Sequence, residues 1–195
     1  MTPSSRIVLA SSSAYRKALL ARIGLDCRVI SPDIDENALQ NEMPAATALR
    51  LAESKARRIA ECEPAALIIG SDQVAVLDNE LIGKPGSHAA AARQLEAMSG
   101  KTVVFHTALC LLNAATGAVQ RANVPTTVRF RVLNSAQIER YLHQDQPYDC
   151  AGSAKIEALG IALVERVDSS DPTALIGLPL IALVNMLQQE GITIP

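Results

Sequence analysis

The sequence lacks the residue spacings that are typical of metal-binding and redox motifs. Its four cysteines, Cys27, Cys62, Cys110 and Cys150, lie far apart along the chain, and no CxxC pair occurs. The three histidines have no HExxH spacing, and none has an acidic neighbour in the chain. We therefore expect reduced, mostly buried thiols, histidines with structural or surface roles, and no zinc site.

Long apolar runs and blocks of positive charge are missing as well. No stretch approaches the roughly 20 apolar residues that a membrane-spanning helix needs. The first residues carry no apolar segment like that of a signal peptide. Eighteen Lys and Arg residues oppose twenty Asp and Glu residues, for a formal net charge of -2, without a basic run. We therefore expect a cytoplasmic protein that binds neither nucleic acid nor a membrane surface.

The chain also lacks the glycine-rich phosphate loops of Walker and dinucleotide-binding proteins and the Gly-x-Ser-x-Gly turn of serine hydrolases. What it has is an ordinary globular composition: 195 residues, of which 49% are hydrophobic and 19% charged. This composition excludes collagen, coiled coils and disorder. It predicts one domain, residues 1–195, that buries a core without disulfides.

Apolar periodicity and turn residues divide the chain into alternating strands and helices. Two long β-rich runs, 102–112 and 118–132, flank a turn-forming segment and predict a hairpin. A hairpin among alternating elements favours a mixed α/β sheet over a purely parallel one. The other expected strands are 7–10, 27–30, 66–77 and 161–167, and the expected helices are 14–24, 44–59, 87–98, 135–142 and 178–189.

A serine-rich turn at the first strand-to-helix junction is a candidate anion site. Ser11 and Ser13 precede the helix, and Arg16 lies in its first turn. Hydroxyl donors, free backbone N–H groups and a guanidinium suit a phosphate group. The alternative is that Ser13 only caps the helix and that Arg16 is a solvated surface residue.

Asp72 is the strongest single candidate for chemistry. It lies within an apolar run, where a buried carboxylate is costly unless it is paired, binds a metal ion or faces a cleft. Asp35 and Glu36, in a polar segment, offer oxygen ligands for Mg²⁺ or Mn²⁺. The alternative is that these two acids are part of a solvated loop.

Three lysines, Lys55, Lys84 and Lys155, are candidates for neutralising negative charge. Lys84 lies between Gly83 and Pro85, whose backbone preferences restrain it and suit a fixed point charge. The alternative for each lysine is an ordinary solvent-facing side chain.

Taken together, these residues form seven ordered motifs that resemble the Maf-type nucleoside triphosphate pyrophosphatases. The motifs are Ser11-x-Ser13-x-x-Arg16, Asp35-Glu36, Lys55, Ser71-Asp72-Gln73, Gly83-Lys84-Pro85, Cys150-Ala151-Gly152-Ser153 with Glu157, and Asp171-Pro172 followed by Gly177-Leu178-Pro179. The resemblance spans essentially the whole chain. Because Gln73 stands where the dTTP/UTP subgroup carries Thr, the chain is similar to the subgroup that acts on 7-methyl-GTP.

The resemblance implies an inosine triphosphatase-like fold, with an elongated mixed sheet flanked by helices and two lobes around a cleft. It implies a hydrolase that splits the α–β phosphoanhydride of 7-methyl-GTP into 7-methyl-GMP and pyrophosphate. This would be a house-cleaning reaction of nucleotide metabolism that uses Mg²⁺ or Mn²⁺. Two alternatives stay open: a dTTP/UTP or broad-specificity pyrophosphatase, and a nucleotide-binding regulator of cell division without turnover. A homodimer would be unsurprising.

The resemblance also implies roles for individual residues. Asp72 would accept the proton of the attacking water, Lys55 and Lys84 would be the catalytic lysines on the triphosphate, and Glu36 and Asp72 would hold the metal ion. The other substrate-binding residues would be Ser11, Ser13, Tyr15, Arg16, Gln73, Lys155 and Glu157. Tyr15, Gln73 and Glu157 would select the base, because N7 methylation makes guanine cationic and favours a carboxylate and an aromatic face. The alternative for Glu157 is an ion pair with Lys155 or another cation on a surface loop.

Overall fold

The computed structural model describes residues 7–194, which form two compact units. The first unit comprises residues 7–72, Thr107–Val124 and 171–194, and the second comprises Gln73–His106 and Pro125–Ser170. Three long strands contribute residues to both units. The two units agree with the expectation of two lobes, while the cleft and the folding of the chain as a single domain stay predictions.

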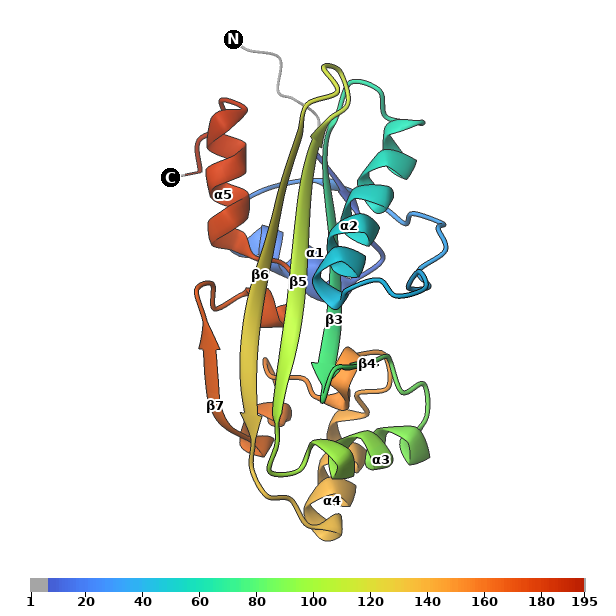
Figure 1. Cartoon of the computed structure of the whole chain (residues 1–195). Helices are drawn as coiled ribbons and strands as arrows, with labels where there is room; N and C mark the ends of the chain where they lie inside the picture. Colours follow the sequence, from blue (N-terminus) through green and yellow to red (C-terminus); the bar gives the residue numbers. More distant parts are fainter. Residues whose placement is uncertain (1–6, 195) are drawn as a thin grey trace. The chain divides into compact units, whose positions relative to one another are not determined.

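The strands form one mixed sheet (Figure 1). Their order is β2-β1-β3-β5-β6-β7, with β4 paired to β3. The strands are β1 (Ile7–Ala10), β2 (Arg28–Ile30), β3 (Leu67–Leu77), β4 (Glu80–Ile82), β5 (Thr102–Asn113), β6 (Val119–Phe130) and β7 (Val164–Ser169). β1 runs parallel to β2 and β3, whereas β4 runs antiparallel to β3 and β7 antiparallel to β6. The expected mixed α/β class is confirmed.

The expected helices form close to their predicted positions. The described residues contain α1 (Ala14–Arg22), α2 (Pro44–Ala60), α3 (His88–Met98), α4 (Ser135–Asp145) and α5 (Leu180–Gln189), and the short 3-10 helices η1 (Ala151–Ser153), η2 (Leu159–Leu163) and η3 (Ala174–Ile176). Ser87, expected as the first helical residue, is the N-cap of α3 and accepts a hydrogen bond from the backbone N–H of Ala90. Among the residues that the structure describes, no helix is both long and apolar enough to cross a membrane.

Close packing of α2 on β3 positions part of the candidate site in the first unit. A Cβ atom added to Gly70 of β3 would lie only 2.1 Å from the carbonyl oxygen of Ala52 in α2. Glycine therefore permits an approach that any side chain would block. Because Lys55 lies on α2 and Asp72 on β3, this approach brings the two residues together.

In the second unit, α3 and α4 contact each other, and they also contact η1 and η2 respectively. Leu95 and Met98 of α3 and Ile138 and Leu142 of α4 are buried. Asn134 caps α4 by accepting from the backbone of the first turn. The two helices therefore support the segment that carries η1 and η2.

One local prediction needs correction, and one hairpin was not predicted. The strand expected at 161–167 is only partly right, because η2 covers Leu159–Leu163 and the strand β7 covers Val164–Ser169. A short apolar run fits either structure, so periodicity alone does not distinguish them. The turn at Asp78 and Asn79, whose φ angles are 52° and 71°, opens a tight hairpin into β4 that we did not expect.

The expectation of mostly buried thiols is wrong. All four cysteines are free, but Cys110 alone is buried, Cys62 is exposed, and Cys27 and Cys150 are half-buried. Desolvation raises the pKa of Cys110 to about 12, so this thiol stays protonated.

Candidate active site

Lys55 lies between two carboxylates in the first unit. Its Nζ is 2.6 Å from Asp72 Oδ1 and 2.7 Å from Glu36 Oε1. Lys55 and Asp72 are only 5% and 7% exposed, whereas the Glu36 side chain is 50% exposed. The short contacts offset the cost of burying the ammonium and the carboxylate. We call these three side chains the acidic group, and solvent can reach it at Glu36. Because Glu36 pairs with the buried Lys55, it is more than part of a solvated loop.

The serine-rich turn builds a second polar cluster in the same unit. Ser13 caps α1, since its side chain accepts a hydrogen bond from the backbone N–H of Arg16 at 3.4 Å. The Arg16 side chain is half-buried: Nε donates to the carbonyl of Gly177 at 2.8 Å, and Nη1 donates to Ser11 Oγ at 3.3 Å. The capping alternative is thus correct for Ser13, but Arg16 is not a solvated surface residue.

Arg16 also lies in the electrostatic field of the acidic group. Desolvation lowers the pKa of Arg16, while the charges of Asp72 and Glu36 raise it. A guanidinium pKa starts so high that Arg16 stays charged at neutral pH. Arg16 and the two carboxylates therefore interact electrostatically within the first unit.

The carbonyl of Gly177 is a part of the site that our sequence analysis missed. It accepts hydrogen bonds from Arg16 Nε and, at 2.9 Å, from Ser71 Oγ. Gly177 has a φ of 118°, a conformation that strongly favours glycine. The Gly-Leu-Pro motif was visible in the sequence, but a backbone carbonyl gives no side-chain signal of its role.

Asp171 anchors the loop that presents this carbonyl. Its Oδ1 accepts from the backbone N–H and the hydroxyl of Thr173 at 3.0 and 2.7 Å, and its Oδ2 accepts from the N–H of Ile181 in α5 at 2.7 Å. Asp171 is buried, with 2% exposure. The Asp171-Pro172 motif therefore fixes backbone geometry around Arg16.

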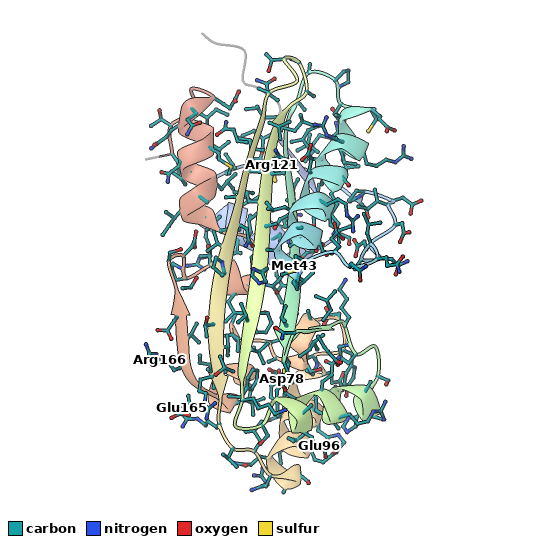
Figure 2. The ribbon with its side chains drawn as sticks, viewed as in Figure 1. Met43, Asp78, Glu96, Arg121, Glu165 and Arg166 are labelled. Atoms are coloured by element: carbon teal, nitrogen blue, oxygen red, sulfur yellow. The ribbon has the colours of Figure 1, made fainter. Side chains whose placement is uncertain are left out.

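Glu42 organises the segment that carries Glu36. Its carboxylate accepts from both Nε and Nη2 of Arg50, at 2.7 and 2.8 Å, and from the N–H of Leu39 at 3.1 Å. Arg50 Nη2 also donates to the carbonyl of Asn37 at 3.0 Å. The exposed Met43, labelled in Figure 2, follows Glu42 directly and is the N-cap residue of α2. Arg50, on α2, thus ties the segment to this helix.

Glu42→Gln is expected to remove an acid-sensitive part of the protein's stability. Hydrogen bonding from Arg50 is the main cause that lowers the pKa of Glu42 from its usual 4.5 to about 2. A lowered pKa in the folded state stabilises the fold above pH 4.5, and this contribution is lost as the pH falls to about 2. The Tm of the wild type should therefore fall more steeply than that of the variant across this range, as followed by circular dichroism.

The matched control is Glu61→Gln, which removes an exposed carboxylate paired with Arg58 at the surface. This control should keep the pH dependence of the wild type. If the Glu42→Gln and wild-type Tm curves run parallel from pH 4.5 to 2, Glu42 does not have the assigned role.

The second unit holds Lys84 on a restrained loop. The carbonyl of Gly83 accepts from Gln94 Nε2 at 3.1 Å, and the N–H of Gly86 donates to the carbonyl of Tyr148 at 3.0 Å. Lys84 itself is exposed. Gln94 Oε1 also accepts from the Ser153 hydroxyl, so one glutamine joins the loop of Lys84 to η1.

Lys155 is fixed against α4 in the same unit. Its backbone N–H donates to the Tyr141 hydroxyl at 2.9 Å, and its Nζ donates to the carbonyl of Asp145 at 3.1 Å. A Cβ atom at Gly160 would lie 2.5 Å from the Lys155 carbonyl oxygen, so glycine is needed for this turn. Lys155 is therefore not an ordinary solvent-facing lysine.

Glu157 lies at the surface of the second unit, two residues after Lys155. Desolvation is the main cause that raises the pKa of Glu157, and the nearby charge of Lys155 acts in the opposite direction. Neighbouring atoms thus partly shield this carboxylate from water, which disfavours its charged form.

The predicted site residues divide between the two units. The first unit contains both clusters described above, formed by Ser11, Ser13, Arg16, Glu36, Lys55 and Asp72. It also contains Tyr15, which is half-buried in the first turn of α1. Gln73, Lys84, Lys155 and Glu157 belong to the second unit. The roles of all these residues toward a nucleotide stay predictions.

Glu36 and Asp72 have the donor chemistry of a magnesium or manganese site. Both carboxylates lie within hydrogen-bond distance of the same Lys55 ammonium, so their oxygens converge on one region. Mg²⁺ is usually held by one or two carboxylates, with water and substrate phosphates completing the coordination. The residues therefore fit such an ion.

Comparison with known proteins assigns this chain to one family. A family model described as Maf-like protein matches residues 6–190. The chain belongs to the Maf-like family. A relative named 7-methyl-GTP pyrophosphatase, from Thiobacillus denitrificans, is 58% identical over 98% of this chain and 95% of its own. Relatives with the same name from Cupriavidus metallidurans and Aromatoleum aromaticum are 57% and 56% identical, over 95% and 98% of this chain and 93% and 98% of their own.

The Maf-like match extends from the start of β1 to the end of α5 and so includes both units. The acidic group, the Arg16 cluster and the Asp171 anchor all lie within it. The resemblance on which the sequence analysis relied is thereby confirmed.

Proposed function

We propose that this Maf-like protein is a nucleoside triphosphate pyrophosphatase that hydrolyses 7-methyl-GTP to 7-methyl-GMP and pyrophosphate. The structural observation that carries the proposal is the buried Asp72–Lys55 pair next to Glu36. The near full-length similarity to relatives named for this substrate supports the choice of nucleotide.

The first unit has the groups that phosphoanhydride hydrolysis needs. Lys55 binds Asp72 Oδ1 at 2.6 Å and so orients this carboxylate. The other carboxylate oxygen of Asp72, Oδ2, accepts a proton from the water that attacks phosphorus. The α–β bridging bond then breaks, and pyrophosphate leaves. Arg16, Ser11 and Ser13 bind phosphate oxygens. A Mg²⁺ or Mn²⁺ ion held by Glu36 and Asp72 would neutralise charge on the phosphates.

The second unit contributes the remaining binding groups of the proposal. Lys84 and Lys155 add positive charge for the triphosphate, on a loop and a turn that hydrogen bonds restrain. Gln73 and Glu157 read the edge of the base, and Tyr15 of the first unit offers an aromatic face. A methylated guanine carries a positive charge, so Glu157 favours it over neutral bases.

Glu157→Gln is expected to reduce the preference for 7-methyl-GTP over GTP. Loss of a carboxylate that interacts with the cationic base should compress the ratio of the two kcat/KM values by ~tenfold or more, for an interaction worth ~1.5–3 kcal/mol. The measurement is pyrophosphate release for 7-methyl-GTP, GTP, dTTP and UTP, with and without Mg²⁺, for wild type and variant.

Glu165→Gln is the matched control, because it removes an exposed carboxylate from β7 of the same unit (Figure 2). It should leave the ratio unchanged. A wild-type ratio near one contradicts the substrate assignment, whereas a high ratio that survives Glu157→Gln assigns base selection to Gln73 or Tyr15.

The same nucleotide panel distinguishes the alternatives. Similar rates with dTTP, UTP and 7-methyl-GTP indicate a broad-specificity pyrophosphatase. Nucleotide binding without pyrophosphate release indicates a regulator. The presence of Asp72 together with both catalytic lysines favours turnover, because a binding module needs no proton acceptor.

A cytoplasmic enzyme with a nucleotide as its main partner agrees with two further features. The four cysteines are free, as in most proteins of reducing compartments. The formal charge of -2 disfavours binding to nucleic acid or to an anionic membrane surface.

A further inference from the structure

Three side chains of types that can ligate a metal ion meet in the second unit, outside the residues assigned to nucleotide hydrolysis. His88 is the first residue of α3, and Glu139 and His143 are one turn apart on α4. One ligand atom of each lies within 4.8 Å of the other two. Glu139 Oε2 is 2.9 Å from His88 Nε2 and 3.7 Å from His143 Nε2, and the two imidazole centroids are 5.2 Å apart.

Tyr148 fixes the imidazole ring of His88. Its hydroxyl oxygen is 3.0 Å from His88 Nδ1 and 3.4 Å from the carbonyl oxygen of Leu142, to which the hydroxyl can only donate. In this arrangement the hydroxyl accepts from Nδ1–H, and Nε2 is directed toward Glu139 Oε2. At 2.9 Å this nitrogen and the carboxylate oxygen share a proton, and a metal ion bound by both groups would replace that proton.

We propose that His88, Glu139 and His143 bind a zinc-class divalent ion that links α3 to α4. The same carboxylate oxygen faces a second imidazole, since His143 Nε2 lies 3.7 Å from Glu139 Oε2, one turn along α4. Two imidazoles and one carboxylate are ligands that suit Zn²⁺, Co²⁺ or Ni²⁺, whereas Mg²⁺ prefers oxygen ligands. The hydrogen bond from His88 Nδ1–H to Tyr148 is the support that orients histidine ligands at protein metal sites.

The surroundings leave this site open to solvent. The side chains of His88, Glu139 and His143 are 36%, 48% and 75% exposed. An ion therefore reaches the ligands directly, and water completes its coordination. Because α4 also holds Lys155 through Tyr141 and Asp145, the ion would stiffen the support of a proposed substrate-binding lysine.

The test is isothermal titration of the full chain with Zn²⁺ in excess Mg²⁺, which occupies oxygen-rich sites. The wild type should bind one Zn²⁺ per chain and gain Tm on binding. His143→Ala removes an exposed ligand without disturbing the core. It should weaken Zn²⁺ binding by ~10–100-fold or more and abolish the gain in Tm.

Two further variants separate this site from the proposed nucleotide site. Glu36→Gln alters a proposed Mg²⁺ ligand and should bind Zn²⁺ like the wild type. Tyr148→Phe should stay folded and weaken Zn²⁺ binding by ~tenfold. The proposal is overturned if the wild type binds no Zn²⁺ in excess Mg²⁺, if His143→Ala binds it as tightly as the wild type, or if binding is lost in Glu36→Gln instead.

Discussion

Asp72→Asn is expected to lower kcat by ~10²–10⁴-fold, the usual contribution of general-base assistance. Asparagine keeps the shape of the side chain and can still accept from Lys55 Nζ, which lies 2.6 Å from Asp72 Oδ1. It cannot take the proton of the attacking water. Pyrophosphate release measured at saturating 7-methyl-GTP therefore tests the chemical role of Asp72.

Asp78→Asn is the matched control for this experiment. Asp78 lies at the hairpin turn after β3, labelled in Figure 2, and its exposed carboxylate pairs with Lys101 at 2.9 Å. Asparagine tolerates the φ of 52° at this position, so the control should fold and turn over like the wild type. Binding of a non-hydrolysable nucleotide should survive in Asp72→Asn. Activity within a few-fold of the wild type would remove Asp72 from the mechanism.

Removal of divalent cations is expected to abolish activity, and Glu36→Gln is expected to raise the Mg²⁺ requirement. A carboxamide is a weaker ligand than a carboxylate for a hard cation. Loss of a residue that merely supports a metal ligand already costs ~10–100-fold in metal affinity, so Glu36→Gln should raise the Mg²⁺ concentration for half-maximal rate at least that much. The measurement is the initial rate over a Mg²⁺ titration after treatment with a chelator.

Asp35→Asn provides the neighbouring control. Asp35 Oδ1 accepts the backbone N–H of Asn37 at 2.9 Å, a bond that an asparagine oxygen can also make. The Mg²⁺ requirement of this variant should match that of the wild type. Full activity in excess chelator rejects the metal requirement, whereas an unchanged requirement in Glu36→Gln assigns the ligand to another residue.

The candidate site shows how far local sequence patterns lead. Asp72 could be singled out because a carboxylate within an apolar strand is costly unless it has a partner. The identity of that partner could not be derived, since Lys55 is on a helix and Glu36 in an irregular segment, and each alone resembles a surface residue. The contact of α2 with Gly70 brings Lys55 to the strand, and the Glu42–Arg50 pair holds the segment of Glu36.

The three histidines show that a cluster built from two helices cannot be found from local sequence patterns. Their spacing excluded a zinc motif on a single helix, and our expectation of no zinc site followed from that. The Glu139–His143 pair, one helical turn apart, was visible in the sequence. His88 comes from another helix, so no local pattern joins it to the pair.

The sequence by itself determined the family of this protein and most of its helices and strands. Periodicities of two and 3.6 residues, together with Ser and Pro near helix starts, act over a few residues and are legible in any chain. The tertiary structure decided which groups meet: Lys55 between two carboxylates, the Gly177 carbonyl against Arg16, and Glu139 between two imidazoles. These contacts depend on packing between segments distant in the chain, and a side chain's burial and partners are properties of that packing rather than of its neighbours in sequence.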